Sequence, residues 1–458
     1  MPEDAYDLIV LGGGSGGYAC ALRAAELGKR VALIERDARL GGTCLLRGCV
    51  PTKAFLESAA VFDHVQRSQE WGIEASGRVD WAAVKAFEER IVDKKVSGLT
   101  GLVKTRGIEV IAGEGRLAPG PGVQLGDRTL SAPDVVLATG SFARLLPGIE
   151  RGPRVLTSDD VFAMETLPSS IVIIGSGAVG VEFASMFRSF GAEVTVLEAL
   201  PRVVPLEDED LSKELARAFR KRGIQALAGV KVTGVTPSDS GVEVAYEGAK
   251  GPASVSADLC LVAVGRGPNS DGLQEAGVEL DRGYVKVDGS LQTTVPHVWA
   301  VGDLAATPLQ FAHSAFAEGM AVAERAAGMD VPELDYDAIP RVTFSQPEIS
   351  SVGLTEAAAV EQGHAVQTKT LNFQVLSKAN IVGEGGICKV VTEAEGGPTL
   401  GVHMIGPHVT DLISEAMLAT AWEAAPAEVA ALIHPHPTLS EALGEAFLAL
   451  AGRPLHVP

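Results

Sequence analysis

Residues 8–17 read LIVLGGGSGG and residues 171–180 read IVIIGSGAVG, so an apolar run followed by G-x-G-x-x-G occurs twice in this chain. Each copy continues into a helical pattern and a second apolar run that ends at an acidic residue, Glu35 or Glu198, at the same distance from the first glycine. One copy is weak evidence, because tight turns use the same glycines. Two matched copies predict two Rossmann-like nucleotide-binding units.

The physical roles of these residues explain their spacing. Glycines let the backbone approach a pyrophosphate, the N-terminus of the next helix stabilises its negative charge, and the carboxylate accepts hydrogen bonds from ribose hydroxyls. The residues predicted to bind the first dinucleotide are Gly12, Gly14, Gly17 and Glu35, and those predicted to bind the second are Gly175, Gly177, Gly180 and Glu198.

Both copies also end alike, in an apolar strand pattern and a glycine. DVVLATG ends at Gly140 and DLCLVAVG ends at Gly265, and these glycines are assigned to the first and second site. A third segment contains TVPHVWAVGD (294–303), in which Asp303 follows a short strand pattern. A carboxylate at the end of a strand can face a ligand, although a turn-forming aspartate is an equally good interpretation. Asp303 is assigned to the first site.

From about Tyr336 onward the pattern changes to β-strand runs followed by helical stretches, which predicts a separate α+β domain. We therefore expect an α/β protein with two Rossmann-like domains and a C-terminal α+β domain. The predicted boundaries are 1–145 with 270–335 for the first nucleotide-binding domain, 146–269 for the second, and 336–458 for the C-terminal domain.

Composition and charge exclude some classes of function. The formal net charge is −20 and no Lys/Arg-rich run is present, which argues against a nucleic-acid partner. The opening residues MPEDAYD are acidic, and the longest apolar run contains Glu182, so the sequence predicts neither a signal peptide nor a membrane span. We expect a soluble cytoplasmic protein.

The stretch GGTCLLRGCVPTK (41–53) contains two of only five cysteines. On a regular helix, residues five apart have Cα atoms about 8.6 Å apart, beyond the roughly 7 Å reach of a disulfide. Cys44 and Cys49 can therefore pair only across a distorted turn, which Gly48 and Pro51 can supply. A zinc site would need a second cysteine pair, which is absent. In a reducing compartment, a redox-active disulfide is favoured over a structural one. The spacing alone is also compatible with two free thiols.

The position of the cysteine pair indicates which cofactors are needed. The pair follows soon after Glu35, so it should lie beside the first dinucleotide. Thiols exchange electrons poorly with nicotinamide, whereas a flavin accepts them from a thiolate and passes a hydride to nicotinamide. We expect FAD in the first site and a nicotinamide nucleotide in the second. Glu198 favours NAD over NADP, because a carboxylate repels the 2'-phosphate, and the nearby Arg202 weakens that preference.

Several motifs together carry a family resemblance. GGTCLLRGCVPTK, the two G-x-G-x-x-G units, VGRGPN (264–269), VWAVGD (298–303) and HPHPTLSE (434–441) resemble the flavoprotein disulfide reductases, which are the class I pyridine nucleotide-disulfide oxidoreductases. The match runs nearly end to end and in the family's order. The resemblance implies bound FAD, a bound pyridine nucleotide and a C-terminal domain that forms a homodimer.

The resemblance also implies roles for individual residues around the flavin. It implies that Cys49 is the charge-transfer thiolate beside the flavin and that Cys44 is the outer thiol that reacts with the substrate. It further implies an ion pair between Lys53 and Glu182 beside the flavin ring, and Glu182 is assigned to the NAD site. Lys53 alone would be an ordinary surface charge.

Thiol exchange needs a base, because the thiolate is the nucleophile. The resemblance assigns this role to His436, oriented by Glu441, and places both beside the disulfide of the other subunit. From the residues alone, Thr438 and Glu441 also spell a helix capping box. His434 and His436 could form half of a metal site, but no third ligand is evident and no metal is predicted.

Within the family, the resemblance is closest to members that oxidise dihydrolipoamide with NAD+. No cysteine follows Cys388, whereas mercuric reductases and large thioredoxin reductases typically add a pair there, and glutathione reductases generally prefer NADPH. The implied partners are lipoyl domains and the core subunit of a 2-oxo acid dehydrogenase complex, or the glycine cleavage system. Leu46, Arg47 and Ser314 depart from common family residues, which puts the surroundings of the disulfide and flavin in doubt. The alternatives are a glutathione-reductase-like or mercuric-reductase-like enzyme, and a flavoprotein subunit that chiefly docks.

Overall fold

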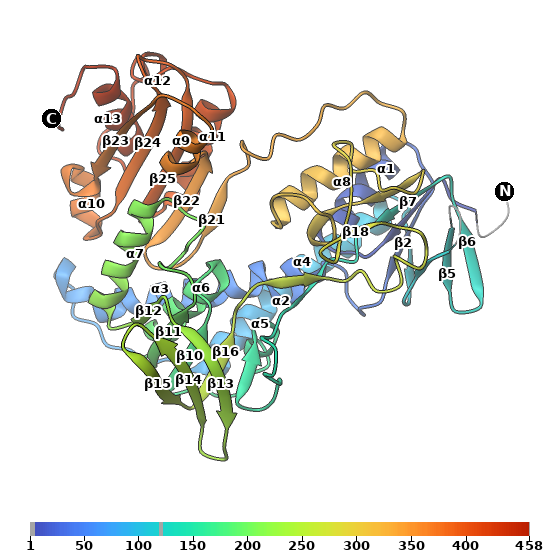
Figure 1. The fold of residues 1–458 in the computed structure, drawn as a ribbon, viewed down its shortest axis with the longest axis horizontal. Helices are drawn as coiled ribbons and strands as arrows, with labels where there is room; N and C mark the ends of the chain where they lie inside the picture. The colour runs from blue at the N-terminus through green and yellow to red at the C-terminus, as the bar shows by residue number, and fades with distance from the viewer. Residues whose placement is uncertain (1–4, 119–121, 458) are drawn as a thin grey trace. The chain divides into compact units, whose positions relative to one another are not determined.

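The computed structural model describes residues 5–118 and 122–457 (Figure 1). The described chain forms two compact units. The first contains the residues up to Ala54, Ala82–Arg144 and Gly265–Tyr336, and the second contains Phe55–Trp81, Leu145–Val264 and the residues from Asp337 onward. Within the described ranges, no helix is long and apolar enough to cross a membrane.

The first unit is built on a five-stranded parallel sheet in the order β3-β2-β1-β7-β20. Its strands are β1 (Leu8–Leu11), β2 (Val31–Glu35), β3 (Glu109–Ala112), β7 (Asp134–Leu137) and β20 (Val298–Ala300). Every residue of β1, β2 and β7 is buried, as expected for parallel strands that are covered on both faces. Helices α1 (Ser15–Glu26) and α8 (Ala312–Ala326) lie so close together that a Cβ atom on Gly319 would collide with the carbonyl oxygen of Gly16.

The other elements of the first unit surround this sheet. They are α2 (Gly42–Arg47), the start of α3 (Cys49–Gln66), most of α4 (Trp81–Thr105), the 3-10 helix η2 (Gly302–Leu304), an antiparallel sheet of β4 (Arg116–Ala118), β5 (Gly122–Leu125) and β6 (Arg128–Ser131), and the antiparallel pairs β8 (Ser141–Ala143) with β17 (Arg266–Pro268) and β18 (Leu280–Asp281) with β19 (Tyr284–Val285).

The second unit also contains a five-stranded parallel sheet, in the order β12-β11-β10-β16-β9. Its strands are β9 (Val155–Thr157), β10 (Ser170–Ile174), β11 (Glu193–Glu198), β12 (Gln225–Ala228) and β16 (Leu259–Val262). The first four strands in this order match β3-β2-β1-β7 of the first sheet, but the edge strand β9 precedes β10 in the chain, whereas β20 follows β7. An antiparallel sheet of β13 (Lys231–Pro237), β14 (Val242–Gly248) and β15 (Gly251–Ala257) lies between β12 and β16 in the chain, as β4–β6 lie between β3 and β7. The helices here are η1 (Ser68–Trp71), α5 (Ser158–Val161), α6 (Ala178–Ser189) and α7 (Glu209–Arg222).

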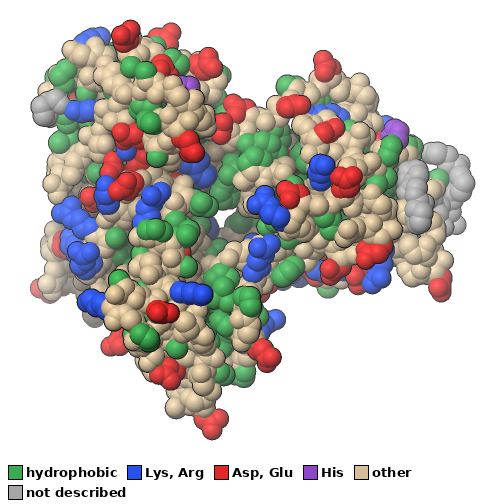
Figure 2. All heavy atoms as spheres, in the orientation of Figure 1, with side chains coloured by type: hydrophobic (Ala, Val, Ile, Leu, Met, Phe, Trp, Pro, Cys, Tyr) green, Lys and Arg blue, Asp and Glu red, His purple; other side chains and the backbone are tan. Residues whose placement is uncertain are grey.

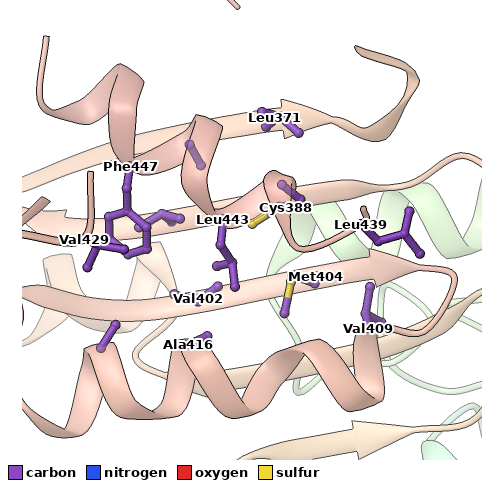
Figure 3. Packing of buried hydrophobic residues seen from close by; sticks show 14 of the residues in the cluster. Leu371, Cys388, Val402, Met404, Val409, Ala416, Val429, Leu439, Leu443 and Phe447 are labelled. Carbon is purple, nitrogen blue, oxygen red and sulfur yellow. The ribbon is translucent and has the colours of Figure 1, made fainter. Parts of the chain in front are cut away.

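The C-terminal part of the second unit contains a five-stranded antiparallel sheet in the order β21-β22-β25-β24-β23. The strands are β21 (Arg341–Thr343), β22 (Glu348–Gly353), β23 (Val366–Asn372), β24 (Ile387–Glu393) and β25 (Thr399–Gly406), and the helices are α9 (Glu356–Glu361), η3 (Phe373–Val375), α10 (Ser377–Val382), α11 (Val409–Ala421), α12 (Pro426–Val429) and α13 (Glu441–Leu450). Figure 3 shows Leu443 and Phe447 of α13 in one apolar cluster with Val402 and Met404 of β25 and Ala416 of α11.

The α/β fold with two Rossmann-like domains and a C-terminal α+β domain, as predicted from the sequence, is confirmed. Over the face in Figure 2, acidic and basic side chains are interspersed, so the net charge of −20 is not gathered in one patch on that face.

Candidate active site

In the first glycine motif, backbone packing requires two of the three glycines. Gly12 has a φ of +105°, and a Cβ atom there would collide with the carbonyl oxygen of Ala138. A Cβ atom on Gly17 would collide with the carbonyl oxygen of Gly12. At Gly14 the nearest atom to the Cβ position is the Cα of Gly42, 3.7 Å away. The fold does not itself need glycine at position 14, and the open space there fits the close approach of a pyrophosphate.

The second motif shows the same division. Gly175 has a φ of +102°, and its Cβ position collides with the carbonyl oxygen of Ala263. The Cβ position of Gly180 collides with the carbonyl oxygen of Gly175. Gly177 precedes α6, and no atom lies within 4 Å of its Cβ position. The residues present therefore fit a dinucleotide in both units, each before a helix of 12 residues.

The acidic residues at the ends of β2 and β11 are held in the same way. Glu35 Oε2 accepts a hydrogen bond from the Gly13 amide at 2.6 Å, and Glu35 Oε1 accepts one from the Asp37 amide at 2.8 Å. Glu198 Oε2 accepts bonds from the amide and hydroxyl of Ser176 at 2.8 and 2.7 Å. Because a carboxylate can accept about four hydrogen bonds, each side chain is oriented and keeps acceptor capacity for ribose hydroxyls.

A cavity of about 610 Å³ lies at the carboxyl ends of β1, β2 and β7 in the first unit. Its lining includes four residues that the sequence assigned to the first site, Gly12, Gly14, Glu35 and Gly140. This edge of a parallel sheet is where nucleotides bind in doubly wound folds. The structure therefore brings these four residues together around a space of ligand size.

Asp303 lies in the first unit in a short polar network. The Ser141 hydroxyl donates a hydrogen bond to Asp303 Oδ2, and Arg266 Nε donates one to Ser141 Oγ at 2.6 Å and lies 3.7 Å from the Asp303 carboxylate. Burial raises the pKa of Asp303, although Ser141 and Arg266 oppose the shift. The sequence analysis did not single out Ser141 or Arg266. Arg266 is the only charged residue of VGRGPN, which is the one signal that could have identified it.

The cysteine pair lies where one helix ends and the next begins. Cys44 is in α2, which ends at Arg47, and Cys49 is the first residue of α3. Gly48 separates the helices, and a Cβ atom there would lie only 2.8 Å from the carbonyl oxygen of Thr43. The expected break in the helix therefore occurs at Gly48. Pro51 falls in the first turn of α3, where its missing N–H is tolerated, so it does not interrupt the helix.

Two residues of α1 lie beside this pair. The Cys44 thiol is hydrogen-bonded with Cys49, which together with burial raises the pKa of Cys44, while a hydrogen bond with Ser15 and the charge of Lys53 lower it. Burial raises the pKa of Tyr18 to about 12, and the two cysteines add to that shift. The sequence analysis missed Ser15 and Tyr18, although Ser15 directly follows Gly14 and Tyr18 directly follows Gly17 of the motif.

The two residues expected to form an ion pair belong to different units. Lys53 lies in α3 within the first unit, and its charge acts on Cys44. Glu182 lies in α6 within the second unit, is 4% exposed, and accepts a hydrogen bond from the Phe344 amide at 2.9 Å. The ion pair between them stays a prediction. Gly265, assigned to the second site, has a φ of +101° and begins the segment that returns to the first unit.

In the tail, His436 Nδ1 lies 2.8 Å from Glu441 Oε1, and Glu441 Oε2 accepts a hydrogen bond from the Thr438 amide at 2.9 Å. Burial raises the pKa of Glu441, but these two hydrogen bonds lower it overall. The Thr438 hydroxyl bonds to the carbonyl of Pro435, so the second half of the capping box does not form. The His436 side chain is 64% exposed and can reach a reactant outside its own chain.

His434 does not join His436 as a metal ligand pair. Its Nε2 lies 2.7 Å from Glu415 Oε1, and that interaction raises the pKa of His434. Among the residues that the structure describes, no group of three or more His, Cys, Asp or Glu is placed to hold a metal ion.

The chain matches the models of one protein family over nearly its whole length. Residues 6–319 match the model of the pyridine nucleotide-disulphide oxidoreductase family, and residues 339–447 match the dimerisation domain of that family. The chain is 42% identical to the dihydrolipoyl dehydrogenase of Bacillus subtilis over 98% of this chain and 99% of that protein. It is 40% identical to that of Zymomonas mobilis over 99% of both chains. The crystal structure of LpdA from Mycobacterium tuberculosis superimposes with a TM-score of 0.89 at 27% identity, covering 97% of this chain and 99% of the other.

Proposed function

Because the chain belongs to the pyridine nucleotide-disulphide oxidoreductase family, we propose that it is a dihydrolipoyl dehydrogenase. The reaction converts protein-bound dihydrolipoamide and NAD+ into lipoamide, NADH and a proton. The proposal rests chiefly on the Cys44–Cys49 pair, whose thiols are in hydrogen-bonding contact at the junction of α2 and α3. Full-length similarity to dihydrolipoyl dehydrogenases supports the same reaction.

The cofactor sites follow from the two Rossmann-like domains. The residues proposed to hold FAD are Gly12, Gly14, Gly17, Glu35, Lys53, Gly140 and Asp303, and those proposed to hold NAD are Gly175, Gly177, Gly180, Glu182, Glu198 and Gly265. The proposed domains are 1–145 with 270–335 for FAD, 146–269 for NAD and 336–458 for the dimer interface. Bound together, the two cofactors supply electron acceptance from a thiolate and onward transfer as hydride.

The choice of NAD over NADP is supported by the surroundings of Glu198. A carboxylate at the end of the second strand of this domain would accept a hydrogen bond from a ribose hydroxyl and repel a 2'-phosphate. Arg202, the basic residue that could have offset this, donates hydrogen bonds to the carbonyl oxygens of Pro205 and Glu207 at 3.0 and 3.2 Å. Its guanidinium group is thus engaged within its own loop.

The thiol chemistry uses the chain's own residues. In the oxidised enzyme, a substrate thiolate attacks Sγ of Cys44, a substrate–Cys44 disulfide forms, and the Cys44–Cys49 bond breaks with its electron pair on Cys49. The second substrate thiol then displaces Cys44, which closes the lipoamide disulfide and leaves Cys44 reduced. The hydrogen bond with Cys49 and burial raise the pKa of Cys44, and the positive charge of Lys53 opposes that rise.

The proton of each substrate thiol needs an acceptor, and we assign that role to His436. Its Nδ1 is held by Glu441 at 2.8 Å, which leaves Nε2 as the atom that can take a proton from a thiol. In the proposed homodimer this imidazole serves the disulfide of the partner subunit. Thiol deprotonation therefore depends on assembly of two chains.

The match to a dimerisation domain supports a homodimer. In the single chain, Trp422, Leu432 and Ile433 are 75%, 63% and 96% exposed. Large apolar side chains exposed to this extent typically mark an interface, and a second copy would cover them.

The proposed partners are lipoyl domains and the core subunit of a 2-oxo acid dehydrogenase complex, or the glycine cleavage system. Two alternatives remain, a glutathione-reductase-like or mercuric-reductase-like enzyme, and a flavoprotein subunit that chiefly docks. The retained Cys44, Cys49, His436 and Glu441 favour the dihydrolipoamide reaction over docking alone.

Steady-state assays of the purified protein test the proposal. Dihydrolipoamide with NAD+ should turn over faster than NADPH with glutathione disulfide or Hg(II), and two-electron reduction should produce a long-wavelength band from a Cys49 thiolate beside FAD. Cys44→Ser should abolish dihydrolipoamide oxidation, while Cys388→Ala, which alters a buried cysteine of the C-terminal sheet, should not. Undiminished turnover by Cys44→Ser would eliminate the proposed reaction.

A further inference from the structure

A buried carboxyl in α8 contacts the turn that carries Asp303. Glu318 is 0% exposed. Its Oε2 accepts a hydrogen bond from the Gly302 amide at 2.6 Å, and its Oε1 accepts one from the Tyr336 hydroxyl at 2.8 Å. The first donor lies 16 residues before Glu318 in the chain and the second lies 18 residues after it. A fully buried carboxyl is costly to desolvate, so a specific pair of donors at this place needs an explanation.

The Gly302 amide is a group that local structure does not satisfy. Gly302 has a φ of +70° and is the first residue of η2, so its N–H precedes the first hydrogen bond of that helix. Glu318 supplies the missing acceptor from a neighbouring element. The conformation of Gly302 sets the direction in which the next residue, Asp303, leaves the end of β20.

The Asp303 carboxylate accepts a hydrogen bond from Ser141, and Arg266 lies beside both groups. Two contacts therefore act on Asp303: Glu318 holds the amide of the preceding residue, Gly302, and Ser141 holds the Asp303 carboxylate. The Tyr336 hydroxyl donates a hydrogen bond to the second carboxylate oxygen of Glu318. Tyr336 is also the last residue of the first unit, so the same carboxyl holds the segment from which the C-terminal domain continues.

We propose that Glu318 and Tyr336 are positioning residues for the flavin site, in which Glu318 holds the Gly302–Asp303 turn and Tyr336 holds Glu318. The inference rests on the proposed function, because FAD is the ligand that this turn is proposed to serve. Neither residue touches the reacting atoms in this proposal, and their effect is on the affinity for FAD.

The protonation of Tyr336 is consistent with its part as a donor. Burial raises the pKa of Tyr336, and the adjacent Glu318 raises it further, so the hydroxyl keeps its proton over the working pH range. Burial also raises the pKa of Glu318, and the Gly302 amide and the Tyr336 hydroxyl oppose that shift. The Thr307 hydroxyl opposes the shift as well.

Four variants separate positioning from general stability. Glu318→Ala removes both acceptors, and Glu318→Gln keeps an amide oxygen for Gly302 and an N–H for Tyr336. Tyr336→Phe removes only the hydroxyl. Glu324→Gln is the matched control, because Glu324 lies on the same helix and pairs with Arg23 instead of Gly302.

The measurements are the dissociation constant for FAD, from titration of the apoprotein by flavin fluorescence, and Tm with and without FAD. A buried donor left unpaired typically costs enough to change an equilibrium by about tenfold or more. We therefore expect a dissociation constant at least about tenfold higher for Glu318→Ala, a few-fold higher for Tyr336→Phe, and near the wild-type value for Glu318→Gln and Glu324→Gln. The rise of Tm on adding FAD should shrink in the same order.

An unchanged FAD affinity in Glu318→Ala would overturn the inference, as would a fall in Tm that is equal with and without FAD, since that marks a purely structural role. If Glu318→Ala cannot be obtained folded, Tyr336→Phe decides, and wild-type affinity in that variant overturns the inference. A wild-type protein with no affinity for FAD would refute the proposed function as well, which separates the two failures.

Discussion

Replacement of Gly177 by alanine tests whether the second glycine motif holds a dinucleotide. No atom lies within 4 Å of the Cβ position of Gly177, and its φ of −68° suits any residue. Gly180 is the opposite case, because its Cβ position collides with the carbonyl oxygen of Gly175. The protein should therefore tolerate a methyl group at position 177 and not at position 180.

The expected magnitudes follow from this geometry. Alanine is a poorer N-cap than glycine, which costs about 0.5–1 kcal/mol, but it lowers the entropy of the unfolded chain by a similar free energy. The free energy of unfolding should thus change by about 1 kcal/mol or less. A methyl group in the path of the pyrophosphate should prevent close approach to the amides of α6, and loss of hydrogen bonds to a charged group, about 1.5–3 kcal/mol, weakens binding by roughly 10- to 100-fold.

The assay measures KM for NAD+ and quenching of protein fluorescence by NADH, with Tm measured on the same preparations. Gly177→Ala should raise KM and leave Tm within a few degrees, Gly180→Ala should lower Tm sharply, and Gly14→Ala should weaken FAD instead of NAD. A wild-type KM for NAD+ in Gly177→Ala would mean that the open space at position 177 is not a pyrophosphate site. A large fall in Tm would mean that the packing argument is wrong.

Two further predictions concern the tail and a buried cation. Glu441→Ala removes the acceptor 2.8 Å from His436 Nδ1, so kcat for dihydrolipoamide should fall at least about tenfold while KM for NAD+ stays constant, and a fall in neither parameter would contradict this. Lys389→Met leaves the buried Asp208, 3.0 Å from Nζ, without its cation, and should cost about 3 kcal/mol in urea unfolding near pH 7, whereas the exposed Lys213→Met should change little. Burial raises the pKa of Asp208, but a backbone amide and Lys389 lower it overall, so its stabilisation is present at neutral pH and is lost as the pH falls below the ordinary aspartate pKa of about 4 and through the lowered pKa. The deficit of Lys389→Met should therefore shrink toward that pH, and an equal deficit at both pH values would refute this reasoning.

The local parts of the site were predictable because each depends on a short stretch of chain. The glycine motifs combine positive φ at Gly12 and Gly175 with a strand before and a helix after, all within about one element. The break between α2 and α3 falls at Gly48, whose Cβ position would lie 2.8 Å from the carbonyl oxygen of Thr43. The duplicated pattern predicted two Rossmann-like domains, because each copy contains its own apolar strand, glycine turn and helix.

Other parts depend on residues that are distant in sequence. Glu318 meets Gly302 and Tyr336 only because α8 packs beside the end of β20, and Arg266 reaches Ser141 only because β17 pairs with β8. Lys389 on β24 meets Asp208 at the start of α7 in the same manner. None of these residues lies in a sequence motif from which its hydrogen-bond or ion-pair partner could be predicted.

The identity of the fold, the two nucleotide motifs and the cysteine pair are thus contained in the order of the amino acids, since steric limits on φ and the periodicity of buried residues act over a few positions. The partners of buried charges, and the support behind Asp303, exist only in the folded chain. Desolvation makes each buried charge require a nearby donor or counter-charge, but which side chain fills that requirement is settled by the packing of elements that are remote in sequence.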